Sequence, residues 1–250
     1  MPVQNTPLSD AKFMLEAARA HIRDADHALH DFNKSHPYEI IEKLDPATDE
    51  TIVCVSMKSD IPSKIKILTR DAADKLYTCL NFLIFQLAVE NGKSNSGIQF
   101  LATKSKSSFE LAMAGEKMKD ISTKAKNFIN ELEPYMGGKG EMLYILKSLR
   151  NPGSHRRLVA IGRDHHLSGS FQAGPNGSIA VKSLSWQSLE KDVEILRMSG
   201  SGNRYQIDLA IRLSFIEFEN IKHEPILPLL AKFANQVEDI IVEAEKRFFN

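Results

Sequence analysis

The side chains best suited to chemistry lie between positions 150 and 157, where one histidine, one asparagine and three arginines fall within eight residues. A Pro-Gly pair inside the segment predicts a turn that brings Arg150 and His155 close together. A histidine can exchange a proton near neutral pH, and a guanidinium can bind a phosphate through two hydrogen bonds. With the ribose 2′-hydroxyl as nucleophile, such a pair could cleave RNA without a metal ion. The candidate catalytic residues are Arg150, His155 and Asn151, and the candidate substrate-binding residues are Arg156 and Arg157.

The same segment also has a structural interpretation. Arg150 falls at the end of a predicted helix, where a cation can bind the last carbonyl groups and suits the helix dipole. Asn151 would then belong to an ordinary turn, and His155 would be a surface or hydrogen-bonded histidine. The residue types alone leave both interpretations open.

The spacing of Arg150 and His155 resembles the Arg-x4-His motif of HEPN domains, in which a polar residue such as Asn151 often follows the arginine. These domains are helical bundles found in many prokaryotic toxins and phage-defence ribonucleases. The resemblance implies that Arg150 and His155 are catalytic or phosphate-binding positions. It also implies a homodimer, in which two copies of the motif form one cleft.

A wider resemblance covers most of the chain. The order of its predicted elements is similar to that of a large uncharacterised bacterial family, whose members carry two motifs. The later motif, Asn-x-x-Lys-His-Arg, matches at Asn151, His155 and Arg156, with Ser154 where lysine is usual.

The earlier motif of that family, Leu-Arg-Ser-Ala-Leu-Asp-His, aligns with positions 76–82. Its arginine is Tyr77 in this chain, and its histidine is Phe82. If the family's site needs both motifs, this chain lacks half of it. This departure favours a second functional class, a non-catalytic interaction or scaffold protein on the same fold.

Other residue patterns predict neither a metal site nor a cofactor. Cys54 and Cys79 lie far apart in apolar runs, which indicates buried thiols rather than a disulfide or a zinc site. The sequence 163–166 reads Arg-Asp-His-His, and adjacent histidines on a strand point to opposite faces, so they do not predict a shared metal. Motifs for nucleotide cofactors, P-loops, serine hydrolases and zinc proteases are absent from the sequence.

Composition places the chain among ordinary globular proteins, with 250 residues, 42% hydrophobic and 26% charged. Its 32 basic and 32 acidic residues cancel, so any contact with RNA would be local rather than driven by net charge. The sequence predicts no signal peptide, because its first residues lack a basic region followed by an apolar one. The longest apolar stretch, 79–89, is too short to span a bilayer, so a cytoplasmic protein without membrane contact is predicted.

Apolar periodicity predicts the helices. Residues 8–32 place an apolar side chain every three or four positions, which indicates one long amphipathic helix. Residues 69–90 would form a helix with apolar side chains on nearly all of its faces, which is typical of a buried central helix. Shorter helices are predicted at 106–115, 121–133 and 140–149, and a closing helix at 226–248.

Strands are predicted in two places. Two β-rich runs within 38–57 flank a turn and indicate a hairpin, and residues 158–217 change to a period of two, which indicates an antiparallel meander. The predicted fold class is α+β: a HEPN-like helical bundle core with an N-terminal β-hairpin and a C-terminal antiparallel β-meander. We expect residues 1–250 to form one compact domain, with a mainly helical core over 1–157.

Overall fold

The computed structural model describes residues 6–93, 97–150, 161–182, 192–215, 221 and 224–250. The chain combines helices with antiparallel strands, so the predicted α+β class is confirmed. Its Cα positions divide into two compact units, Met1–Ala25 with Ile67–Val159 and Leu227–Asn250, and Asp26–Lys66 with Ala160–Ile226. Each unit is described separately below.

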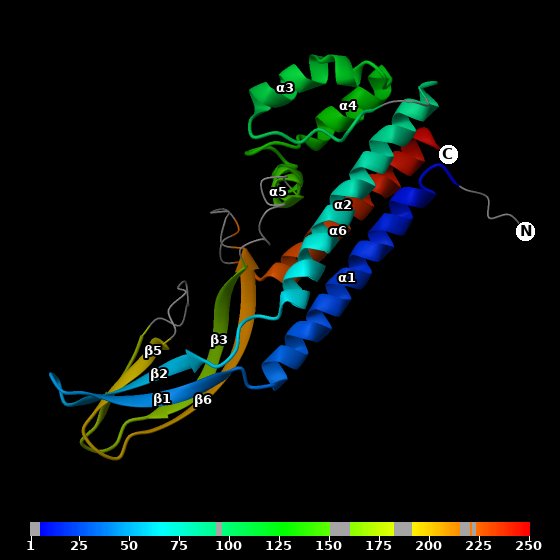
Figure 1. Ribbon diagram of the computed structural model, residues 1–250. Helices are drawn as coiled ribbons and strands as arrows, with labels where there is room; N and C mark the ends of the chain where they lie inside the picture. Colours follow the sequence, from blue (N-terminus) through cyan, green and yellow to red (C-terminus); the bar gives the residue numbers. More distant parts are fainter. Residues whose placement is uncertain (1–5, 94–96, 151–160, 183–191, 216–220, 222–223) are drawn as a thin grey trace, which may run out of the picture. The chain divides into compact units, whose positions relative to one another are not determined.

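Three long helices contribute most of their residues to the first unit, where they run alongside one another (Figure 1): α1 (Ser9–Lys34), α2 (Ser63–Glu90) and α6 (Ile226–Phe248). The predicted stripe of α1 is buried where it belongs to this unit, since Leu8, Leu15 and Ala18 are at most 4% exposed. Ion pairs fix α1 against α6, because Lys12 Nζ lies 2.6 Å from Glu245 Oε1 and Arg19 Nη2 lies 2.6 Å from Glu238 Oε2. The order of these pairs makes the two helices antiparallel.

Helix α2 is buried along one broad face and half-buried over most of the rest, whereas its sequence predicts burial nearly all round. Leu76, Leu80 and Leu83 are each 0% exposed. The helix begins at Ser63, six residues before the predicted start, directly after Pro62. Its first turns continue the buried stripe through Ile65 and Thr69, whose spacing from Leu76 matches the helical period. Among the described residues, no helix combines the length and apolar character needed to cross a bilayer.

The shorter helices lie where the sequence predicts them: α3 (Lys106–Ala114), α4 (Thr123–Leu132) and α5 (Glu141–Arg150), with a 3-10 turn at Glu116–Met118. Serine side chains cap two of them, since Ser105 Oγ accepts from Ser108 N and Ser122 Oγ accepts from Ala125 N, each at 3.2 Å. Four apolar residues of α5 are buried, namely Leu143, Ile145, Leu146 and Leu149. This packing holds the last residue of α5, Arg150, at a fixed place beside α2.

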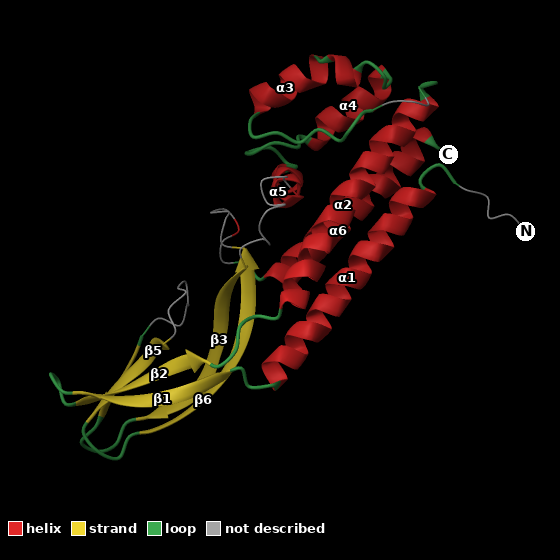
Figure 2. Ribbon diagram, in the orientation of Figure 1, coloured by secondary structure: helices red, strands yellow, loops and turns green. Residues whose placement is uncertain are grey.

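The second unit contains six described strands (Figure 2): β1 (Tyr38–Asp45), β2 (Glu50–Met57), β3 (Ile161–Gln172), β4 (Ser178–Val181), β5 (Asp192–Ser199) and β6 (Arg204–Phe215). They form a four-stranded antiparallel sheet in the order β1-β2-β5-β4 and a two-stranded β3-β6 ribbon. The N-terminal hairpin over 38–57 is confirmed, with Tyr38 opposite Met57.

The C-terminal strands are antiparallel as predicted, but their order is not that of a simple meander. Strand β3 pairs with β6 over its full length, from Ile161 opposite Phe215 to Gln172 opposite Arg204. Both strands have 12 residues, whereas β4 has four and could not satisfy the backbone groups of β3. Strand β2 is buried at five consecutive positions, 53–57, and its backbone pairs with β1 at one edge and with β5 at the other.

Candidate functional site

Of the five predicted site residues, the structure describes Arg150. Asn151, His155, Arg156 and Arg157 lie outside the described residues. Arg150 is the last residue of α5, so the proposed site begins where this helix ends. Its surroundings in the first unit can therefore be compared with the catalytic and the structural interpretation of the motif.

An ion pair and an aromatic ring hold the guanidinium of Arg150. Its Nε donates a hydrogen bond of 2.7 Å to Asp74 Oδ1, and its central carbon lies 5.4 Å from the centre of the Tyr77 ring. The Arg150 side chain is 34% exposed and that of Asp74 is 50% exposed. Within the described part of the chain, Nη1 and Nη2 of Arg150 have no partner, so that edge of the guanidinium can still bind an anion.

Tyr77, whose ring contacts Arg150, is itself held in place by Phe100. Its hydroxyl donates a hydrogen bond of 2.7 Å to the carbonyl oxygen of Phe100, and the two rings meet edge to face with centres 6.2 Å apart. Burial raises the pKa of the Tyr77 hydroxyl above its ordinary value, and Arg150 acts in the opposite direction. Tyr77 aligns with the arginine of the earlier family motif. In this chain the Tyr77 ring at that position lies against the guanidinium of Arg150, the last residue of α5.

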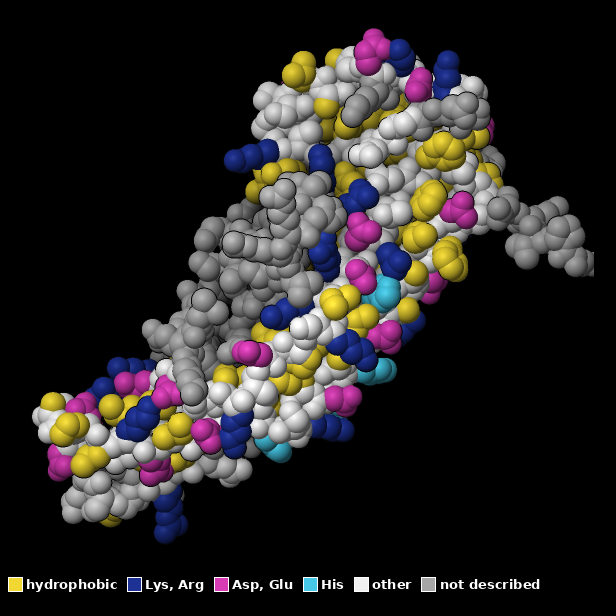
Figure 3. All heavy atoms as spheres, in the orientation of Figure 1, with side chains coloured by type: hydrophobic (Ala, Val, Ile, Leu, Met, Phe, Trp, Pro, Cys, Tyr) yellow, Lys and Arg dark blue, Asp and Glu magenta, His cyan; other side chains and the backbone are white. Residues whose placement is uncertain are grey.

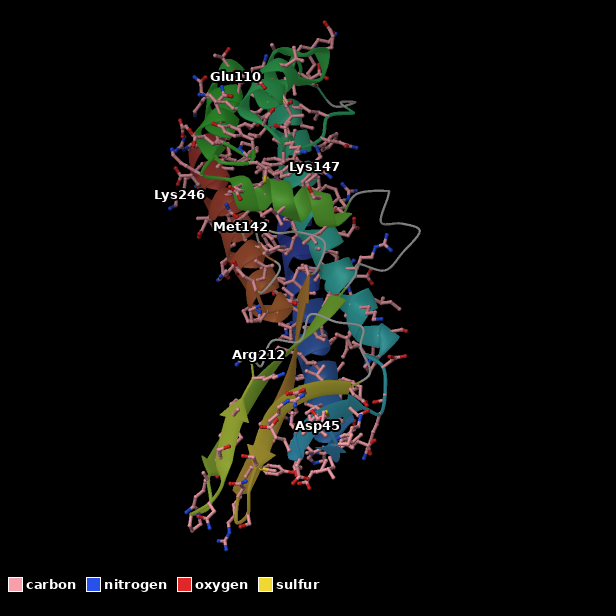
Figure 4. The ribbon with its side chains drawn as sticks, turned by 90° about the vertical axis from the view of Figure 1, so that its left-hand side faces the viewer. Asp45, Glu110, Met142, Lys147, Arg212 and Lys246 are labelled. Atoms are coloured by element: carbon pink, nitrogen blue, oxygen red, sulfur yellow. The ribbon has the colours of Figure 1, made fainter. Side chains whose placement is uncertain are left out.

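A second cation lies one turn before Arg150. Lys147 Nζ donates a hydrogen bond of 2.6 Å to the carbonyl oxygen of Ala102, and Figure 4 shows Lys147 on α5 where this helix passes α2. Burial lowers the pKa of Lys147 from its ordinary value. Because residues three apart share a helix face, Lys147 and Arg150 project from the same side of α5. We refer to Asp74, Tyr77, Lys147 and Arg150 as the Arg150 cluster.

A surface groove runs along α2, beginning one helical turn beyond Asp74. Its volume is about 410 Å³, and it is lined by Thr78, Asn81, Phe82, Phe85, Gly97, Ile98 and Gln99. The segment 97–100 is attached to α2 because Phe100 N donates a hydrogen bond of 3.0 Å to Asn81 Oδ1. We call this feature the α2 groove. No sequence pattern predicts this groove, because it depends on how a loop without regular structure lies against the helix.

Outside the Arg150 cluster and the α2 groove, the described residues offer few groups that could bind a metal ion or react. Among them, no three His, Cys, Asp or Glu side chains lie close enough together to hold a metal ion. Cys54 and Cys79 are free and buried, and burial raises the pKa of the Cys79 thiol to about 12, which makes it unreactive at neutral pH. On the face drawn in Figure 3, lysine and arginine side chains of the described residues are interspersed with aspartate and glutamate. This surface agrees with local rather than general recognition of an anion.

No family model, curated protein or solved structure matches this chain. The likeness to HEPN domains and to the uncharacterised bacterial family therefore remains a prediction from the sequence motifs. The geometry adds Asp74, Tyr77 and Lys147 to the predicted site. Asp74 lies 76 positions before Arg150, so no local sequence pattern predicts that the two residues pair.

Alkaline unfolding tests the burial of Tyr77. Because its pKa is raised above 10.0 in the folded protein, the folded state keeps a proton that the unfolded state releases. Its contribution to stability is therefore complete below pH 10 and is lost as the pH rises above that value. We expect Tyr77→Phe to reduce the free energy of unfolding at pH 7 by about 1 kcal/mol, through loss of one hydrogen bond. Between pH 10 and 11, the variant should then lose less stability than the wild type.

Urea denaturation at a series of pH values measures the loss of stability of Tyr77→Phe at pH 7 and the change in stability of both proteins above pH 10. Cys79 titrates in the same direction in both proteins and cancels in the comparison. Parallel curves for wild type and Tyr77→Phe above pH 10 would contradict the assignment of a buried, neutral Tyr77.

Proposed function

We propose that this protein is a cytoplasmic, HEPN-like RNA-binding protein that acts as a homodimer and cleaves RNA without a metal ion. The observation that carries the proposal is the state of Arg150, which is anchored through Nε while Nη1 and Nη2 have no partner within the described part of the chain. A guanidinium fixed in this way can bind a phosphate without first losing side-chain freedom. His155 follows within the same short segment and supplies the proton-transferring group.

In the proposed reaction, His155 removes the proton from a ribose 2′-hydroxyl, and the resulting oxygen attacks the adjacent phosphorus. The bond from phosphorus to the 5′-oxygen of the next nucleotide breaks, that oxygen takes up a proton from water, and His155 returns its proton to the solvent. The products are a 2′,3′-cyclic phosphate and a 5′-hydroxyl. Arg150 stabilises the additional negative charge on the phosphate oxygens as the attack proceeds.

A specific observation favours the second functional class, a non-catalytic interaction protein. The Arg150–Asp74 pair and the Tyr77 ring give Arg150 a structural role that needs no substrate. The histidine of the earlier family motif is also replaced, by Phe82. On this alternative, Arg150 joins α5 to α2, and the chain binds no RNA.

Binding of RNA distinguishes the two classes. We would measure fluorescence anisotropy of a labelled single-stranded 2′-O-methyl RNA in EDTA, because such a strand lacks the nucleophile and stays intact. If Arg150 contacts one phosphate, Arg150→Ala should weaken binding and lower the slope of log affinity against log salt by about 0.7. Arg23→Ala is the matched control, since Arg23 is an exposed arginine on α1, and it should bind like wild type. Absence of binding by folded wild type would favour the interaction protein.

A further inference from the structure

The α2 groove has a composition suited to a flat, unsaturated ligand. Phe82 and Phe85 are half-buried and lie three residues apart on α2, and the buried residue Ile98 also lines the groove. Polar groups occur among the lining residues too, from Thr78, Asn81 and Gln99. A volume of about 410 Å³ lies within the range of about 300–1,000 Å³ that small-ligand sites occupy.

One polar group of the groove is fixed in its orientation. Asn81 accepts a hydrogen bond from Phe100 N through its side-chain oxygen, which sets the orientation of its NH2 group as a donor. Gln99 is exposed and carries both a donor and an acceptor. Partly exposed aromatic rings beside amide groups form the kind of surface on which unpaired bases stack and are bound at their edges.

The groove adjoins the Arg150 cluster. Asp74 and Thr78 are separated by one turn of α2, a rise of about 6 Å, and residues four apart share a helix face. Arg150 bonds to Asp74, and Lys147 lies one turn before Arg150 on α5. The charge of Asp74 is offset by Arg150, so Lys147 leaves this cluster with one net positive charge. Arg150 is thus bonded to a residue one helical turn from the groove, which suits it to bind a phosphate next to a base held in the groove.

We propose that the α2 groove binds an unpaired base of single-stranded RNA, stacked on Phe82 or Phe85, while Arg150 binds a neighbouring phosphate. This inference rests on the proposed function and specifies its substrate as a single strand with exposed bases. Double-stranded RNA keeps its bases stacked inside the helix and would not present one to the groove. The groove also assigns a role to Phe82, the residue that replaces the histidine of the earlier family motif.

The test compares two strands of equal length and charge, a labelled single-stranded 2′-O-methyl RNA and the same sugar-phosphate strand without bases. Stacking of one base changes affinity by about 5- to 150-fold, so the strand without bases should bind wild type more weakly by that factor. Phe82→Leu should weaken binding of the complete strand to a similar extent and leave binding of the baseless strand unchanged. Phe13→Leu is the matched control, because Phe13 lies on α1 with 69% of its surface exposed.

The outcomes separate this inference from the proposed function. Binding that depends on Arg150 but is equal for the two strands, and unchanged by Phe82→Leu, would overturn the base site and leave RNA binding in place. Absence of RNA binding by folded wild type would overturn both. If Phe85→Ser dissociated a dimer in light scattering without changing RNA affinity, the groove would belong to a second copy of the chain, and the base site would be overturned.

Discussion

Replacing Leu80 by alanine should reduce the free energy of unfolding by about 3 kcal/mol, within the range of about 2–5 kcal/mol for leucine-to-alanine changes in a core. Leu80 is 0% exposed and lies on the buried face of α2 in the first unit. The substitution removes three carbon atoms and leaves a cavity that close-packed neighbours cannot fill completely. Chemical denaturation followed by far-UV circular dichroism measures the loss.

The control for this variant is a large apolar residue on the surface. Phe13 is 69% exposed on α1, so Phe13→Ala should change the free energy of unfolding by less than about 0.5 kcal/mol. Similar losses for Leu80→Ala and Phe13→Ala would show that α2 is not the central buried helix of this unit.

We expect Arg150→Ala to slow RNA cleavage by about 100- to 1,000-fold. Removing one hydrogen-bond donor that stabilises the charge of a transition state usually has an effect of this size. Arg150→Lys should recover part of the rate, because lysine keeps the charge but cannot form two parallel hydrogen bonds to a phosphate. Single-turnover kinetics on a labelled RNA measure the chemical step without product release.

Measuring the free energy of unfolding of Arg150→Ala distinguishes a loss of catalysis from a loss of folded protein. Arg150 forms one partly exposed ion pair and one cation–π contact, so Arg150→Ala should cost about 1–2 kcal/mol of stability. Asp74→Asn tests the anchor itself, because an amide still accepts a hydrogen bond from Nε but no longer attracts the guanidinium as an ion. A cleavage rate that falls only in proportion to the folded fraction of Arg150→Ala would contradict a role in catalysis.

The helices could be predicted closely because their signals are local. The three-and-four spacing of Leu8, Ala11, Leu15 and Ala18 determines which face of α1 is buried, whatever the rest of the chain does. The hairpin could be predicted for the same reason, since a turn between two β-rich runs brings neighbouring strands together. The missed part of α2 also had a local signal, because Ile65 and Thr69 extend its buried stripe toward Pro62.

Strand order and the Arg150 cluster could not be predicted because they depend on residues far apart in the sequence. The pairing of β3 with β6 sets Ile161 opposite Phe215, a partner that no short window of the sequence reveals. Asp74 is an ordinary acidic residue on a helix until α5 brings Arg150 to it. Comparison with the family motif indicates that Tyr77 replaces a functional arginine. The structure shows that the Tyr77 ring contacts the guanidinium of Arg150, which no comparison of motifs predicts.

The central claim is that Arg150 and His155 cleave RNA without a metal, and cleavage of a labelled pool of single-stranded RNAs in EDTA tests it most directly. Wild type, Arg150→Ala and His155→Ala would be compared, with His27→Ala as control because His27 is an exposed histidine on α1. We predict cleavage by wild type and by the control that leaves 2′,3′-cyclic phosphate ends, and its loss in the other two variants. Equal cleavage by all four proteins, or none by folded wild type, would contradict the claim.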